Sequence, residues 1–187
     1  MTTPQDSNTS AGGICPEGIV FSDDVKRAYE ATFFTRFSIK PKRCICFTES
    51  LWSQVKRIVT ILGGDKATMG TYVQNIIDFH LDENKVVIAE LTAASFLSDT
   101  DEKAMNSLSA AARKYQACFL TGDGVNRTTN QIYVSRDCAQ RLKRIVKDVG
   151  GENPTIGGYV DAILREHFDD CADLIAEMTN DKYRKPI

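Results

Sequence analysis

Hydrophobic and polar residues follow the same order twice along this chain, 87 positions apart. In each copy a short alternating stretch, Cys44–Phe47 or Gln131–Val134, precedes a helical pattern. Successive side chains of a strand point to opposite sides, so the alternation predicts a strand with one buried face. The buried positions that it predicts are Ile45, Phe47, Ile132 and Val134.

Two amphipathic helices are expected after each strand. In the first helix, apolar residues recur at the spacing of one helical face. They are Leu51, Val55, Ile58, Val59 and Leu62 in one copy, and Cys138, Leu142, Ile145, Val146 and Val149 in the other. Glycine pairs at 63–64 and 150–151 predict the end of this helix. Thr68 and Thr155 are suited to N-cap the second helix, whose apolar stripe persists for about six turns.

The two copies align without a gap from Arg43–Thr92 to Asn130–Thr179, with 18 identities over 50 positions. With one inserted residue, YEATFFT at 29–35 recurs as YQACFLT at 115–121. Two copies are too few for a solenoid, which needs at least three repeats. A single strand, in turn, leaves its backbone groups without partners. We therefore expect the two strands to pair antiparallel with four helices beneath them.

The predicted fold is mainly α with a short two-stranded antiparallel ribbon, a tandem ribbon-helix-helix that forms an intramolecular pseudo-dimer. Strand–helix–helix units paired in this way resemble the Arc- and MetJ-type repressors, in which a β-ribbon reads DNA. The predicted organisation is a flexible segment (1–28), a first unit (29–96), a linker with a helix (97–114) and a second unit (115–187). The two units are expected to form one compact domain.

IYVSRD and GYVDAILREHF in the second unit, with YQACFL upstream, carry a more specific resemblance. They resemble the TraB-like conjugal-transfer domain of unknown function encoded by Bacteroides-type conjugative transposons. The resemblance covers each unit nearly from end to end. Members of that family usually carry one copy, so the duplication is a departure. The resemblance implies association with DNA on a mobile genetic element.

Composition indicates an ordinary soluble globular protein, with 42% apolar and 26% charged residues. No apolar run is long enough for a membrane-spanning helix, and the first residues, MTTPQDSNTSAGG, do not resemble a secretory signal. The six cysteines show no framework spacing, which favours reduced thiols. We expect a cytoplasmic monomer without membrane association.

Catalytic and metal chemistry find little support in the motifs. Cys44 and Cys46 lie on one short strand, and neither of the two histidines falls in a zinc spacing with them. His80 and His167 occupy equivalent positions on the apolar stripe, which predicts packing histidines with an internal hydrogen bond. No serine or cysteine motif accompanies them, and no phosphate-binding glycine motif is present. We expect no enzyme activity, no metal and no cofactor.

Charge is unevenly distributed along each copy. Segments 36–57 and 127–147 each hold six basic residues against one acidic residue, whereas segments 78–90 and 161–177 have net charges of −3 and −5. Such a polar distribution suits phosphate contact on one face, with solvated helix faces as the alternative. Positive helix starts would add to it. The predicted phosphate contacts are Arg43, Lys56, Arg57, Lys66, Thr68, Arg136, Lys143, Arg144 and Thr155.

The outward residues of the two strands are the predicted base readers: Cys44, Cys46, Thr48, Gln131, Tyr133 and Ser135. A two-stranded ribbon fits the major groove of double-stranded DNA. Because the strands differ, one molecule would read an asymmetric site. We therefore expect a DNA-binding accessory or regulatory protein of a mobile element.

Two other functions remain open. Two cysteines are weak hydrogen-bonding readers, which favours a protein-interaction module of a conjugation or recombination complex that kept the fold without sequence-specific DNA binding. An antitoxin is the third hypothesis, although such proteins usually append a flexible toxin-binding tail, and few residues follow Asn180.

Overall fold

The computed structural model describes residues 20–97, 108–120, 130–150 and 154–184. These residues form helices and one two-stranded antiparallel sheet. In chain order the elements are α1 (Asp23–Phe33), β1 (Lys42–Cys46), α2 (Glu49–Ile58), the π-helical turn η1 (Val59–Gly63), α3 (Met69–Glu83), α4 (Lys85–Leu97), α6 (Ala110–Phe119), β2 (Gln131–Ser135), α7 (Arg136–Val149), α8 (Ile156–Asp170) and α9 (Ala172–Arg184).

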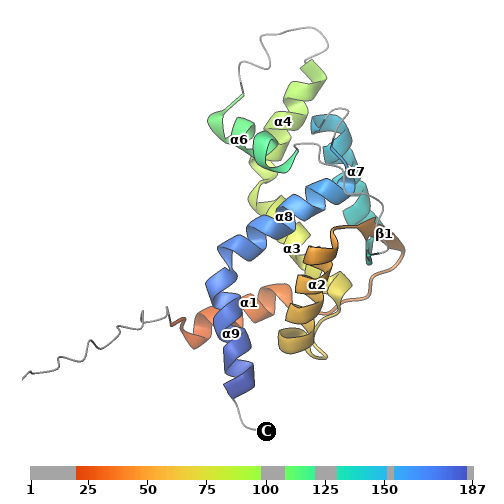
Figure 1. Ribbon diagram of the computed structural model, residues 1–187. Coiled ribbons are helices and arrows are strands. Elements are labelled where there is room, and N and C mark those ends of the chain that lie inside the picture. Colours follow the sequence, from red (N-terminus) through yellow and green to blue (C-terminus); the bar gives the residue numbers. More distant parts are fainter. Residues whose placement is uncertain (1–19, 98–107, 121–129, 151–153, 185–187) are drawn as a thin grey trace, which may run out of the picture.

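Helices α3 and α8 cross near the middle of the molecule, and the sheet lies to one side of them (Figure 1). Helices α1 and α9 lie toward one end, and α4 and α6 toward the other. Every one of these elements contributes buried apolar side chains to a single core. The bulkiest fully buried side chains are those of Tyr72, Tyr159, Phe34 and Phe47.

Strand pairing follows the prediction. β1 and β2 are antiparallel, with Cys44 opposite Tyr133 and Ile45 opposite Ile132. The four residues predicted to be inward, Ile45, Phe47, Ile132 and Val134, are all buried. The alternation of apolar and polar residues therefore assigned the two sides of this sheet correctly.

The predicted tandem ribbon-helix-helix pseudo-dimer is wrong. Among the described residues each half of the chain holds four α-helices rather than two, and the two-stranded sheet is a minor part of a mostly helical structure. Helix α1 precedes β1 and helix α6 precedes β2. Both helices begin in segments predicted to be flexible or linking and continue into the predicted units, where they bury aromatic side chains in the core; these are Tyr29, Phe33, Tyr115 and Phe119. Residues 23–28, predicted to be flexible, form the start of α1.

The predicted six-turn helix bends at a single residue in each half. Asn84 separates α3 from α4, and Cys171 separates α8 from α9. At the first bend φ is −97° and ψ is 11°, and the Asn84 side-chain amide donates to the His80 carbonyl at 3.0 Å. The bends direct α4 onto α6 and α7, and α9 onto η1. Each of these last helices thereby packs against the other half of the chain.

Helix caps agree with the prediction. The Thr68 hydroxyl accepts from the Thr71 backbone N–H at 3.2 Å, and the Thr155 hydroxyl accepts from the Gly158 N–H at 3.0 Å. Gly64 follows the π-helical turn with a φ of +49°, a conformation that side-chain-bearing residues rarely adopt. The glycine at this position therefore ends the helix, as predicted.

Two buried polar clusters connect the halves reciprocally. The Tyr29 hydroxyl lies 2.7 Å from the Tyr72 hydroxyl and 3.0 Å from Nε2 of His167. The equivalent residues repeat the arrangement with the two halves exchanged: Tyr115, Tyr159 and His80. Each histidine thus bonds to a tyrosine from the other copy. The packing role predicted for both histidines is confirmed.

Candidate nucleic-acid interface

The outward side of the sheet is polar and open to solvent. Three pairs of opposing residues form it: Lys42 and Ser135, Cys44 and Tyr133, and Cys46 and Gln131. Tyr133 is 51% exposed, and Nζ of Lys42 lies 5.6 Å from the centre of its ring. Lys42 is absent from the predicted base readers. Extending the alternation two residues before Cys44 would have included it.

A groove of about 460 Å³ lies between β1, α7 and the start of α8. Arg43, Arg136 and Lys143 line it, together with Cys44 and Cys46. None of its described lining residues is acidic, and none of the three cations forms an ion pair with another described residue. We call this feature the basic groove.

The first turn of α8 forms one wall of the basic groove. Thr155, Ile156 and Gly157 line it there. Backbone N–H groups in the first turn of a helix have no carbonyl partner within the helix and carry a partial positive charge. The groove therefore combines three side-chain cations with a helix start, an arrangement that suits a phosphate group.

The corresponding helix start in the first half is in close contact with the sheet. A Cβ atom on Gly70 would lie 2.5 Å from the carbonyl oxygen of Tyr133 and 3.0 Å from Cδ1 of Ile39. Only glycine permits this approach of α3 to β2 without a shift of the backbone. The two helix starts thus differ: α3 packs directly on its strand, whereas α8 borders a groove.

Replacing Gly70 by alanine is expected to destabilise the protein by about 1–3 kcal/mol, because the added methyl group meets a backbone oxygen that cannot move independently. Urea unfolding followed by circular dichroism measures the change. At an ordinary glycine inside a helix, the same substitution would stabilise the protein by up to about 1 kcal/mol. A stabilised Gly70→Ala variant would therefore contradict the close approach.

The predicted phosphate contacts separate into two groups in the structure. Arg43, Arg136, Lys143 and Thr155 come together around the basic groove. The other five lie elsewhere. The Lys56 amine lies 4.9 Å from the centre of the Trp52 ring, and Lys66 forms an ion pair with Glu30 at 2.8 Å. Arg57 lines a groove beside α9, Arg144 lines a groove beside α4, and Thr68 caps α3. Four of the nine predicted phosphate contacts therefore share one site.

The predicted base readers also differ in availability. Cys44, Gln131 and Tyr133 are exposed, and Cys46 is half-buried. Ser135 N-caps α7: its hydroxyl accepts from the Cys138 backbone N–H at 3.2 Å. Thr48 has the equivalent place before α2. Ser135 therefore serves the helix start, and the free polar groups of the outward side are concentrated on β2.

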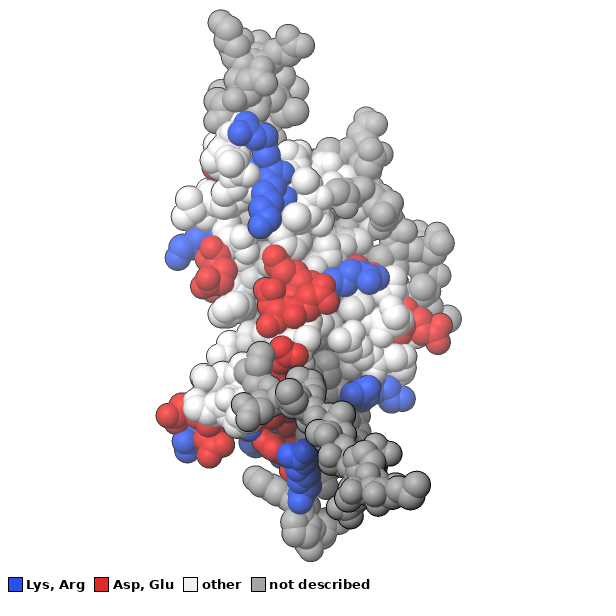
Figure 2. Space-filling model, turned by 60° about the vertical axis from the view of Figure 1, so that its left-hand side comes forward, with Lys and Arg blue, Asp and Glu red and all other residues white. Residues whose placement is uncertain are grey.

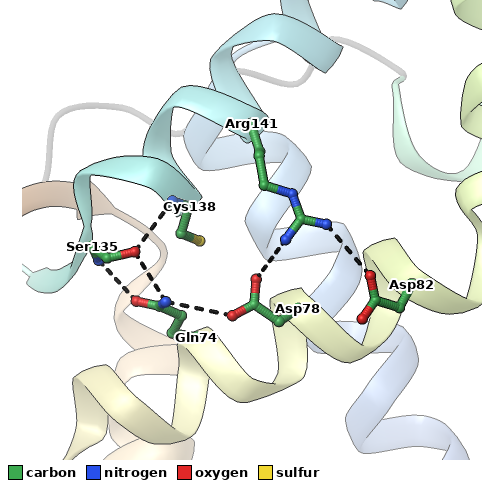
Figure 3. A network of polar contacts seen from close by, with 6 residues as sticks. All are labelled: Gln74, Asp78, Asp82, Ser135, Cys138 and Arg141. Carbon is green, nitrogen blue, oxygen red and sulfur yellow. Dashed lines mark hydrogen bonds and ion pairs between the residues drawn. The ribbon is translucent and has the colours of Figure 1, made fainter. Parts of the chain in front are cut away.

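A polar network fixes the junction of β2 and α7 on α3 (Figure 3). The Gln74 side chain accepts from the Ser135 backbone N–H at 2.8 Å and donates to the Ser135 hydroxyl at 3.0 Å. Farther along α3, Asp78 accepts from Arg141 at 3.0 Å. In the other half, Asp161 of α8 accepts from the Thr48 backbone N–H at 3.1 Å. Each copy thus holds the strand–helix junction of the other.

The electrostatics of the basic groove contrast with those of the α8–α9 region. Cys44 is exposed, but partial desolvation, followed by the neighbouring Cys46 thiol, raises the pKa of its thiol, which therefore stays neutral near pH 7. Glu166, Asp169, Asp170 and Asp173 are all exposed on α8 and α9. Figure 2 shows a group of acidic side chains near the middle of one face, with basic side chains at its edge and in other places on this face. The basic groove, in contrast, has no acidic side chain among its described lining residues.

The fold and this site define a duplicated, mostly helical protein with a basic groove beside a small sheet. The chain belongs to the DUF3408 family, described as a protein of unknown function, whose model matches residues 22–95 and 97–182. The two matches confirm the internal duplication, and they include α1 and α6 in the repeated unit. No curated protein and no solved structure matches the chain.

No helix in the described part of the chain has both the length and the apolar character needed to cross a membrane. Nor do the described residues contain a group of three or more His, Cys, Asp or Glu side chains that could hold a metal ion.

Proposed function

We propose that this protein binds double-stranded DNA through the outward side of β1 and β2 and the adjoining basic groove. The observation that carries the proposal is the groove itself, in which Arg43, Arg136 and Lys143 lie beside a helix start and no described lining residue is acidic. Three cations held together repel one another, and a phosphate group would relieve that repulsion. The DNA backbone supplies phosphates at regular intervals.

The sheet adds a surface of suitable size for base contacts. A two-stranded ribbon can enter the major groove of B-form DNA, where each base pair presents a distinct set of donors and acceptors. Lys42, Gln131 and Tyr133 are the exposed side chains on the outward side that can make polar contacts. The strands differ in sequence, so the proposed target is asymmetric.

The biological setting that we propose is an accessory or regulatory role on a mobile genetic element. It is supported by the resemblance of IYVSRD and GYVDAILREHF to domains of Bacteroides-type conjugative transposons. Deleting the coding sequence from such an element should change the frequency of excision or transfer. Mating assays with the intact and the deleted element measure this.

Removing two groove cations is expected to weaken DNA binding generally. In fluorescence-polarisation titrations with duplex DNA, Arg136→Ala/Lys143→Ala should bind about tenfold or more weakly, and the slope of log affinity against log salt should fall by about 2. Lys182→Ala/Arg184→Ala removes two exposed cations from the end of α9 and is the matched control. Equal losses in both variants, or no binding by the wild type at low salt, would contradict the proposal.

Changing the outward side of β2 should alter the preference for particular DNA sequences rather than the general affinity for DNA. In a selection from a random DNA pool, Gln131→Ala/Tyr133→Ala should enrich a less defined sequence than the wild type while keeping its affinity for unselected DNA. An unchanged enriched sequence would show that these side chains do not read bases.

A further inference from the structure

Helix α4 exposes an apolar side. Its sequence, KVVIAELTAASFL, contains only two charged residues. Val86 and Phe96 are 72% and 73% exposed, and Ala89 and Ala93 are also exposed. These four positions are spaced three, four and three residues apart, so they share one side of the helix. A helix on the surface of a monomer normally places polar residues there.

The same place in the second half of the chain is more polar. At an offset of 87, the counterparts of these four residues in α9 are Asp173, Ala176, Asn180 and Tyr183. Because α9 occupies the equivalent place in the fold with a more polar side, the fold itself does not require the apolar side of α4. This difference between the copies calls for an explanation other than scaffold packing.

A groove of about 260 Å³ lies directly beside this apolar side, between α4 and α7. Its apolar lining includes Leu81, Ile88, Ile145 and Ala89, the last of which also belongs to the exposed side of α4. The groove and the apolar side are therefore continuous. We call the combined surface the α4 surface.

The charged lining of the α4 surface is entirely basic among the described residues: Lys85, Arg141 and Arg144. Arg141 is already paired, at 3.0 Å from Asp78 and 3.6 Å from Asp82. Lys85 and Arg144 form no ion pair with a described residue. A partner that carries acidic groups beside its apolar contacts would therefore be electrostatically complementary to this surface.

We infer that the α4 surface binds an amphipathic helix of another protein, with acidic residues flanking its apolar stripe. A groove between two helices accepts a third helix through anchors spaced i, i+3 and i+7. The thirteen residues of α4 span about 20 Å, enough for three to four turns of a partner helix. A second copy of this chain fits less well, because joining two α4 surfaces would bring Lys85 and Arg144 of both copies together.

This inference is independent of DNA binding, although both sites use α7. Arg136 and Lys143 face the basic groove, whereas Arg141 and Arg144 line the α4 surface. Both partners could therefore be bound at once, on different sides of one helix.

A displayed library of 18-residue helical peptides tests the inference, with fixed apolar anchors and randomised flanking positions. The full chain should enrich peptides with Asp and Glu beside the anchors. Ala89→Arg, which places a long cation in the groove, should weaken binding of an enriched peptide at least tenfold. Ala176→Arg, at the equivalent exposed position of α9, is the matched control and should bind as the wild type does.

Charge reversal and sedimentation complete the test. With the Lys85→Glu/Arg144→Glu variant, the flanking positions of the enriched peptides should change from acidic to basic residues. Absence of acidic enrichment, or equal losses in Ala89→Arg and Ala176→Arg, would overturn the inference. A wild-type dimer in sedimentation velocity that Ala89→Arg dissociates would assign the α4 surface to a second copy and also overturn it. DNA affinity should be unchanged in Ala89→Arg, which separates this result from failure of the proposed function.

Discussion

Replacing Phe47 by alanine is expected to lower the free energy of unfolding by about 3–5 kcal/mol, because the change leaves a large cavity beneath the sheet. Phe47 directly follows β1 and is completely buried. Its backbone N–H donates to the Asn130 carbonyl at 3.4 Å, so the residue lies where the two halves of the chain meet. Chemical denaturation followed by circular dichroism measures the loss.

Tyr133→Ala is the matched control for this prediction. Tyr133 is also an aromatic residue of the sheet region, but it is on the outward side and 51% exposed. Its replacement by alanine should lower the free energy of unfolding by less than about 1 kcal/mol. Similar losses in the two variants would mean that the inward and outward sides of the sheet are assigned incorrectly.

Acid is expected to destabilise the fold through its two histidines. Burial lowers the pKa of His80 to about 4 and that of His167 to about 4, both below the ordinary value of 6.5. Protonation therefore favours the unfolded chain. The stability that the neutral imidazoles contribute is complete above pH 6.5 and is lost as the pH falls toward 4, by roughly 1.4 kcal/mol per pH unit for each histidine.

The two histidines differ in their nearest charge. The carboxylate of Glu166 lies 3.3 Å from Nδ1 of His80 and favours its protonated form, but this carboxylate is half exposed and burial of the imidazole prevails. His167 packs against aromatic rings, including those of Tyr29 and Phe33. Because burial lowers both pKa values to about 4, the two histidines should contribute similar shares of the acid sensitivity.

His80→Gln/His167→Gln tests this prediction, because glutamine keeps a neutral hydrogen-bonding group that does not titrate. The variant is expected to be less stable near pH 7, yet its stability should change much less between pH 6.5 and 5 than that of the wild type. Denaturant midpoints measured across this pH range give the pH dependence of stability for the variant and for the wild type. Parallel slopes would show that the imidazoles do not control the acid response.

Local patterns predicted the parts of the fold that depend on neighbouring residues. Alternation identified both strands and their buried sides, and the repeat supplied the argument for pairing them. Thr68 and Thr155 were identified as caps because a hydroxyl just before a helical stripe satisfies orphan N–H groups. The positions of His80 and His167 on the apolar stripe indicated their burial. Apart from the pairing, which required the repeat, each of these features can be recognised within a few residues.

Features that depend on the three-dimensional arrangement were missed or misplaced. Helices α1 and α6 carry their own signals, the N-capping serines Ser22 and Ser109. The start of α1 was nevertheless assigned to a flexible tail, and α6 crosses from the predicted linker, where a helix was expected, into the second unit. The bends at Asn84 and Cys171 involve neither glycine nor proline. Lys143 and Arg144 are adjacent in sequence but line different grooves, because consecutive residues of a helix point about 100° apart. A count of charges cannot distinguish such neighbours.

Pairing between strands that lie almost ninety residues apart also constrains how the protein is made. While the chain is being synthesised, β1 emerges well before β2, and its backbone edge lacks its partner during that time. At ordinary rates of translation this interval lasts about 4–17 s. An exposed edge can join edges of other nascent chains. Pro41, Lys42 and Arg43 lie at the start of β1, and proline and positive charge there oppose such joining. The cations that we assign to DNA in the finished protein would thus also protect it before folding is complete.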